Sequence, residues 1–149
     1  MRNLVKIKFR KKHLDQFRKM GIHTIYLFGS YAKGKTHSLS DIDFGIVFEK
    51  PEKYKERTLK VYSKLYKIFS EVLPKNYLKK RLKLKEHEFD LVFLQFAPLS
   101  LQIKAIQEGK VIYEGNRKKR FQYQEEVLKK YCDFEYFYNL FSKALIERI

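Results

Sequence analysis

The chain has 149 residues and a formal net charge of +16, because 33 Lys and Arg residues outnumber 17 Asp and Glu residues. Hydrophobic residues make up 44% of the chain, which is enough for a packed core and argues against intrinsic disorder. The single cysteine, Cys132, excludes an internal disulfide and a cysteine zinc site. No run of about 20 apolar residues and no signal-peptide core is present, so we expect one soluble, cytoplasmic domain over residues 1–149, without a membrane segment.

The hydrophobic pattern predicts helices and strands that alternate along the chain. We expect helix 13–20, strand 22–28, strand 44–48, helix 52–73, strand 88–94, helix 98–109, strand 110–113 and a long amphipathic helix over about residues 120–149. Pro98 and Gly109 are a typical start and stop for the helix between them. This order predicts an α/β (α+β) fold, with a small mixed sheet flanked by helices.

Residues 29–36 match the phosphate-binding P-loop pattern G-x-x-x-x-G-K-[ST]. A P-loop lysine and threonine open a sizeable helix, whereas only a few residues separate Thr36 from the next predicted strand. A P-loop enzyme also needs a strand that ends in a magnesium-binding acid, and Asp90 stands at the start of its run. We therefore reject the P-loop interpretation.

The same glycine belongs to a second pattern, in which Gly29-Ser30 is followed by ten residues and then Asp41-x-Asp43. Gly29 allows the backbone to turn sharply off a strand and to approach a ligand closely. Ser30 is suited to cap a short helix, whose free amides favour phosphate oxygens. Lys33 adds positive charge to the same loop, so the pattern predicts a phosphate-binding turn.

Asp41 and Asp43 are two residues apart at a strand entrance, so both carboxylates are expected on one face. Two like charges held together are costly unless a cation lies between them, and Mg²⁺ prefers carboxylate oxygens. Asp90, at the beginning of the third strand, is the candidate for a third carboxylate. Three such acids would suit a two-metal site for displacement at phosphorus.

These residues resemble the active site of the minimal nucleotidyltransferases (MNT) of the polymerase-β superfamily, whose signature is Gly-Ser-x(10)-Asp-x-Asp. More narrowly, nearly the whole chain resembles MntA-type antitoxins, which are encoded beside a HEPN-domain toxin called HepT. Residues 106–113 resemble the helix end and short strand of those proteins, and residues 130–134 resemble their C-terminal helix. The resemblance implies a single nucleotidyltransferase domain with its catalytic core at about 22–113.

The resemblance also implies an activity, namely Mg²⁺-dependent transfer of AMP from ATP to a tyrosine hydroxyl of a HepT-like toxin in a hetero-oligomer, which releases pyrophosphate and neutralises the toxin. Gly29, Ser30 and Lys33 would bind the nucleotide. Asp41 and Asp43 would bind two Mg²⁺ ions, and Asp90 would ligate the ion beside the attacking hydroxyl and help to deprotonate it. Relatives often have Arg where this chain has Lys33, and lysine lacks the bidentate fork of arginine, so we expect an effect on nucleotide affinity.

Two alternatives remain open. A nucleotidyltransferase acting on RNA or tRNA ends is favoured by basic runs at residues 79–85 and 117–120, although such runs are equally explained as solvated faces. A non-catalytic module that blocks its toxin by contact is disfavoured by the clustered acids.

The remaining polar and aromatic residues give weaker signals. His13, His23, His37 and His87 lack the spacing of metal ligands. Cys132 is expected to be buried, and the tyrosines of the last helix are expected in the core or at a partner interface.

Overall fold

The computed structural model describes residues 7–29, 42–73 and 89–147. Within them, four strands form one mixed sheet in the order β3-β2-β1-β4. The strands are β1 (Ile22–Phe28), β2 (Asp43–Phe48), β3 (Asp90–Phe93) and β4 (Lys110–Glu114). β1 is antiparallel to β2 and to β4, whereas β2 and β3 are parallel. The predicted α+β class with a small mixed sheet is confirmed.

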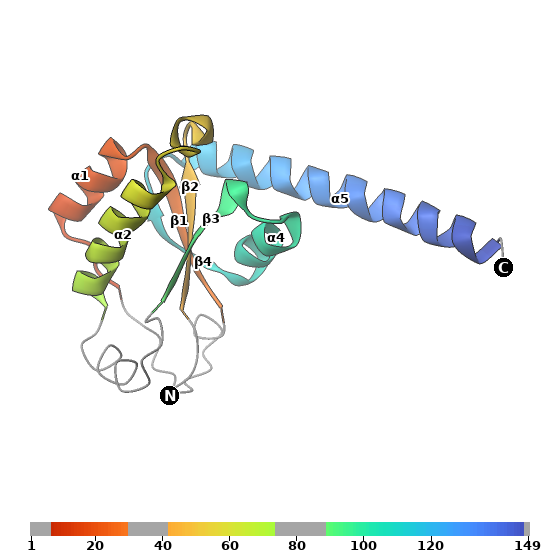
Figure 1. Ribbon diagram of the computed structural model, residues 1–149, viewed down its shortest axis with the longest axis horizontal. Coiled ribbons are helices and arrows are strands. Elements are labelled where there is room, and N and C mark those ends of the chain that lie inside the picture. Colours follow the sequence, from red (N-terminus) through yellow and green to blue (C-terminus); the bar gives the residue numbers. More distant parts are fainter. Residues whose placement is uncertain (1–6, 30–41, 74–88, 148–149) are drawn as a thin grey trace.

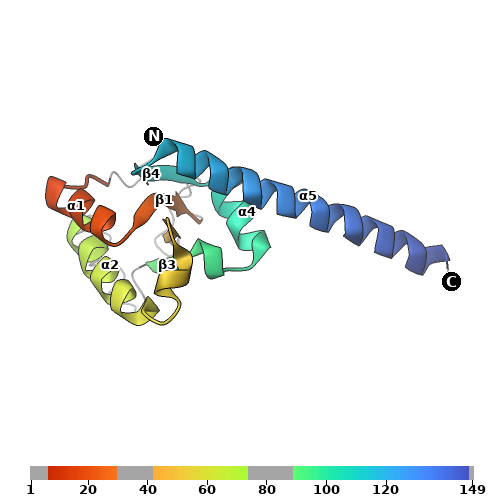
Figure 2. The ribbon, with the colours of Figure 1, turned by 90° about the horizontal axis from the view of Figure 1, so that it is seen from above.

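Helices cover both faces of the sheet (Figures 1 and 2). On one face lie α1 (Lys11–Lys19) and α2 (Thr58–Val72), and on the other lie α4 (Leu99–Glu108) and the first part of α5 (Arg117–Glu147). Two short 3-10 turns, η1 (Pro51–Tyr54) and η2 (Leu94–Phe96), follow β2 and β3. The rest of α5 extends away from the body (Figure 2).

Aromatic rings dominate the core beneath α1 and α2. Phe17, Phe44, Phe69 and Phe89 are all fully or almost fully buried there. The rings of Phe44 on β2 and Phe69 on α2 stack with centroids 3.9 Å apart. This contact fixes α2 against the centre of the sheet.

A second core lies beneath α4 and α5. It contains Tyr26 and Phe28 from β1, Val47 from β2 and Leu94 from η2, and it is closed by side chains of the two helices. Gly45 belongs to this face, and a Cβ atom at its position would lie 2.7 Å from Leu94 Cδ1. The absence of a side chain at residue 45 therefore makes room for Leu94.

Most predicted elements are confirmed to within one or two residues, and three of them differ at their boundaries for structural reasons. The helix expected over 52–73 begins only at Thr58, because η1 occupies its first turn. The strand expected over 88–94 is Asp90–Phe93, and Leu94 already belongs to η2. The last helix begins at Arg117, where the Asn116 side chain accepts a hydrogen bond of 3.0 Å from the Lys119 amide and caps the helix.

The apolar face of the second half of α5 is exposed. Phe134, Phe141 and Leu145 are 53–72% exposed, and Cys132, expected to be buried, is exposed as well. None of the described helices is both long and apolar enough to cross a membrane.

Candidate active site

Three of the predicted site residues meet at one end of the sheet. β1 ends at Phe28, directly before Gly29, and Phe28 pairs with Asp43 at the start of β2. Asp43 in turn pairs with Asp90 at the start of β3. Residues that are 47 positions apart in the sequence are therefore neighbours on adjacent strands.

Asp43 and Asp90 project from the same face of the sheet, because residues in register on parallel strands point the same way. The strand spacing places their Cα atoms about 5 Å apart. The Asp90 amide donates a hydrogen bond of 2.9 Å to the Ile42 carbonyl, which holds this register. The sheet thus brings two carboxylates together at its end.

The two carboxylates differ in their surroundings. Asp43 is half-buried, and its partner on the neighbouring strand β1 is Phe28, which is almost fully buried. Asp90 is exposed, on a strand at the edge of the described sheet. Asp43 is therefore held against the protein body, whereas Asp90 is open to a molecule arriving from solvent.

Gly29 leaves β1 with φ of 94°. A side chain is strained in this conformation, so glycine is required where the chain turns off the strand. Ser30, Lys33 and Asp41 lie outside the described residues, and their predicted roles remain predictions.

The donor chemistry of the site fits Mg²⁺, which binds carboxylate oxygens. Asp43 and Asp90 are suited to serve as two of its ligands. In the described ranges no group of three His, Cys, Asp or Glu side chains is placed to hold a metal ion. The predicted trio includes Asp41, which those ranges omit.

Lys110, which the sequence reasoning did not single out, also lies at this end of the sheet. It opens β4 opposite Leu27, two residues before Gly29, and its side chain is exposed. Its only sequence signal is its position directly after Gly109, the helix stop. Leu27 packs into the core beneath α1 and α2, whereas Phe28, the partner of Asp43, packs into the core beneath α4 and α5, so Lys110 lies on the other face of the sheet from the two acids.

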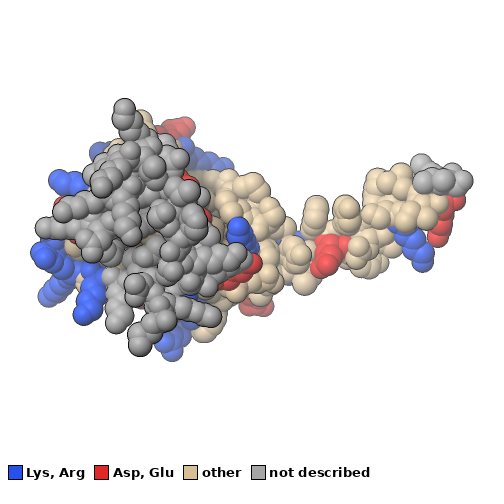
Figure 3. Space-filling model, turned by 90° about the horizontal axis from the view of Figure 1, so that it is seen from below, with Lys and Arg blue, Asp and Glu red and all other residues tan. Residues whose placement is uncertain are grey.

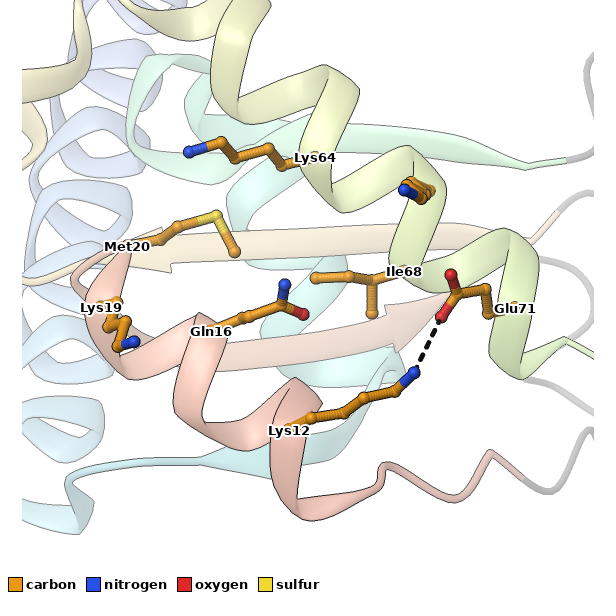
Figure 4. Close-up of a pocket in the computed structure, with 8 residues that line it drawn as sticks. Lys12, Gln16, Lys19, Met20, Lys64, Ile68 and Glu71 are labelled. Carbon is orange, nitrogen blue, oxygen red and sulfur yellow. Dashed lines mark ion pairs between the residues drawn. The ribbon is translucent and has the colours of Figure 1, made fainter.

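A separate hollow of about 520 Å³ lies between α1 and α2, on the opposite face of the sheet (Figure 4). Four lysines line it, namely Lys12, Lys19, Lys64 and Lys67. Lys12 Nζ lies 3.8 Å from Glu71 Oε2, so one of the four charges is partly balanced. The hollow favours anions and is distinct from the carboxylate site.

The comparisons with known proteins agree with this geometry. A family model described as "Polymerase beta, Nucleotidyltransferase" matches residues 11–118, which span the sheet, both acids and Gly29. The chain belongs to this nucleotidyltransferase family. The predicted resemblance to polymerase-β-type nucleotidyltransferases is thereby confirmed.

Solved structures share the fold of this nucleotidyltransferase. A crystal structure of a variant of the toxin–antitoxin MntA–HpeT matches with a TM-score of 0.61 at 18% identity, over 93% of this chain and 99% of the matched chain. A toxin–antitoxin structure with AMP-PNP matches with a TM-score of 0.55 at 21% identity, over 91% of this chain and 96% of the matched chain. No curated protein matches the sequence significantly.

Proposed function

We propose that this nucleotidyltransferase is an antitoxin that transfers AMP from ATP to a tyrosine hydroxyl of a HEPN-domain toxin. The observation that carries the proposal is the register of Asp43 and Asp90 beside the turn at Gly29. Family membership supports nucleotidyl transfer, and the toxin–antitoxin neighbours, one of them with AMP-PNP, support the partner and the nucleotide.

Each residue contributes to the reaction in a different way. Asp41, Asp43 and Asp90 would hold Mg²⁺, which when bound neutralises the triphosphate and makes the α-phosphorus more electrophilic. Gly29, Ser30 and Lys33 would orient the triphosphate. The Asp90 carboxylate would take the proton of the attacking hydroxyl, a new O–P bond would form to the α-phosphorus, and the bond to pyrophosphate would break.

The exposure of Asp90 favours a macromolecular acceptor. Because β3 is an edge strand of the described sheet, none of the described strands lies beside Asp90 on its outer side. A tyrosine on the surface of a second protein can reach such an edge without entering a deep cleft.

The test is AMP transfer from ATP labelled at the α-phosphate, with Mg²⁺ and the cognate toxin. We expect the Asp43→Asn variant to lose at least 100-fold in labelling rate, because it removes a ligand charge from the site. The matched control is Asp133→Asn, which changes an exposed acid on α5 and should leave the rate unchanged. Circular dichroism checks that both variants are folded. Full labelling by folded Asp43→Asn would contradict the proposal.

The lysine-lined hollow between α1 and α2 supports RNA as a second candidate acceptor. RNA labelling should fall steeply with added salt, and Lys64→Glu together with Lys67→Glu should reduce it at constant salt. Label that RNase removes would identify RNA, whereas label that only protease removes would identify a protein. Absence of label with every acceptor would leave a module that blocks the toxin by contact.

A further inference from the structure

An apolar stripe on the second half of α5 has no partner among the described residues. We define this stripe as Phe134, Phe137, Tyr138, Phe141 and Leu145, whose exposed fractions lie between 53% and 72%. They line a shallow hollow of about 370 Å³ along the helix. In Figure 3 this part of α5 extends beyond the body with few charged side chains on the visible face. So large an exposed patch is typical of an interaction surface.

The spacing of the stripe identifies the kind of partner. Val127, Tyr131, Phe134, Tyr138, Phe141 and Leu145 follow one another at intervals of four, three, four, three and four residues. This is the repeat of a helix that packs against another helix. Val127 is buried and Tyr131 half-buried in the core with α4, so the seam begins inside the body and continues outside it.

We propose that the stripe pairs with the same stripe of a second copy of this chain, with the two helices antiparallel. A register that sets Tyr138 opposite the second copy's Phe141 also sets Phe134 opposite its Leu145. In that register the bulky Phe137 lies near the small Ala144 of the second copy. Glu135 lies near Ser142, so no like charges face each other across the seam.

Bulk and charge favour the antiparallel orientation. In each copy the first half of α5, up to the buried Val127, packs against the body of the chain. Parallel helices would therefore place the two bodies side by side, and each belongs to a chain of net charge +16. In the antiparallel register the two Val127 residues lie about 35–40 Å apart along the axis, at 1.5 Å per residue. That separation exceeds the Debye length of about 8 Å at physiological salt, so the repulsion between the bodies is screened.

The buried area reaches what a specific dimer needs. Aromatic side chains bury about 150–250 Å² each, so the five exposed side chains of the stripe offer about 600 Å² per copy. The two copies together exceed the area of about 1,000 Å² expected of a biological interface. We therefore expect a dimer of moderate affinity, populated at micromolar concentrations.

Sedimentation velocity of the purified full chain between 1 and 200 μM tests the proposal. We expect a concentration-dependent dimer and a dissociation constant raised at least 10-fold by Phe134→Glu together with Phe141→Glu. The matched control is Leu140→Glu, which alters an exposed apolar residue of α5 that does not line the hollow and should change the constant less than two-fold. A monomer at every concentration, or a dimer that the stripe variant leaves intact, would overturn the proposal.

The orientation can be measured with the native cysteine. Cys132 is exposed and is the only cysteine of the chain, so one spin label per copy reports the distance between the two helices. The antiparallel register separates the two Cys132 residues by about 22 Å along the axis, whereas parallel helices would place them side by side. Labels at the shorter distance would contradict the antiparallel pairing.

A chain that is monomeric alone and joins the toxin through the stripe would assign the stripe to the toxin instead. Neither measurement uses ATP, so both are independent of the proposed AMP transfer.

Discussion

Gln95, one residue into η2, completes the hydrogen bonding of β2 where β3 has already ended. Its side-chain oxygen accepts a hydrogen bond of 2.7 Å from the Phe48 amide, and its Nε2 donates one of 2.8 Å to the Phe48 carbonyl. Phe48 is almost fully buried, so these backbone groups have little access to water. A side-chain amide here replaces the next residue of a strand.

We predict that Gln95→Ala lowers the free energy of unfolding by about 2–3 kcal/mol, because two backbone groups lose their partners at a buried site. Urea denaturation measures the change. Gln122→Ala, at an exposed position on α5, is the control and should lie within about 0.5 kcal/mol of the unmodified chain. Equal stability of the two variants would mean that water replaces the Gln95 amide.

His23 makes the stability of the fold dependent on pH. It is almost fully buried on β1, its Nδ1 lies 2.7 Å from Thr24 Oγ1, and burial lowers its pKa to about 4. The nearby Glu49 carboxylate opposes this shift and Lys119 adds to it. The unfolded chain, with an ordinary histidine pKa of 6.5, takes up a proton in a range where the folded chain does not.

The free energy of unfolding should therefore fall as the pH decreases from 7 to 5, and His23 should account for about 2 kcal/mol of that decrease. Urea denaturation of the unmodified chain and of His23→Gln at both pH values isolates this contribution. The variant should lose about 2 kcal/mol less than the unmodified chain over the interval. An identical pH dependence of the two proteins would show that folding does not lower the pKa of His23.

At the scale of elements, α5 packs against the described part of the body through its first half. Tyr123 is buried and its hydroxyl donates a hydrogen bond of 2.8 Å to Gln102 Oε1 on α4. Gln124 Nε2 donates one of 2.6 Å to the hydroxyl of Tyr26 on β1, and Val127 is buried one turn further along. Burial raises the pKa of Tyr123 above its ordinary value, so both hydroxyls remain protonated donors or acceptors at neutral pH.

We predict that Val127→Asp destabilises the fold by at least about 3 kcal/mol, because it places a carboxylate in an apolar core. Tyr136→Asp, in the exposed half of the same helix, should change the free energy of unfolding by less than about 0.5 kcal/mol. Thermal unfolding at a protein concentration well below the dissociation constant of the α5 dimer measures both. If both variants were equally destabilised, α5 would unfold as one unit with the body.

The elements that carry strong local signals could be predicted from the sequence. The apolar β-branched run gave β1, and Pro98 and Gly109 bound α4 as expected. The starts of α2 and α5 were wrong because they depend on a 3-10 turn and on the Asn116 cap, which a periodic pattern does not record. The exposure of the second half of α5 could not be predicted, because an amphipathic pattern predicts an apolar face without telling what covers it.

The candidate site was predictable only in part, for a similar reason. The acids could be predicted because their positions at strand starts and the family signature agree. The proximity of Asp43 and Asp90 depends on the order of the strands. Nothing in the local sequence of β3 specifies that this strand lies parallel to β2 rather than beside β4. The position of Lys110 at this end of the sheet, on the other face from the acids, likewise depends on the pairing of β4 with β1.

At the scale of the whole molecule, the excess of positive charge opposes the compact state. With 33 basic and 17 acidic residues, at least 16 basic residues have no acid to pair with, and four lysines gather around the hollow between α1 and α2. Folding brings these charges closer together than they are in the unfolded chain. Salt screens such repulsion, since the Debye length falls from about 30 Å at 0.01 M to about 8 Å at 0.15 M.

We predict that the free energy of unfolding rises by about 1 kcal/mol when NaCl is raised from 0.01 to 0.15 M. Urea denaturation at the two salt concentrations measures the change. Lys64→Gln, which removes one charge from the hollow, should be more stable than the unmodified chain at low salt, and this difference should shrink at 0.15 M. Stability that falls with salt would mean that ion pairs such as those of Glu114 with Arg117 and Arg120 outweigh the repulsion. The sign of the salt effect therefore decides whether the basic surface lowers the free energy of unfolding. Such a destabilising surface is expected where the charges serve to bind an anionic partner.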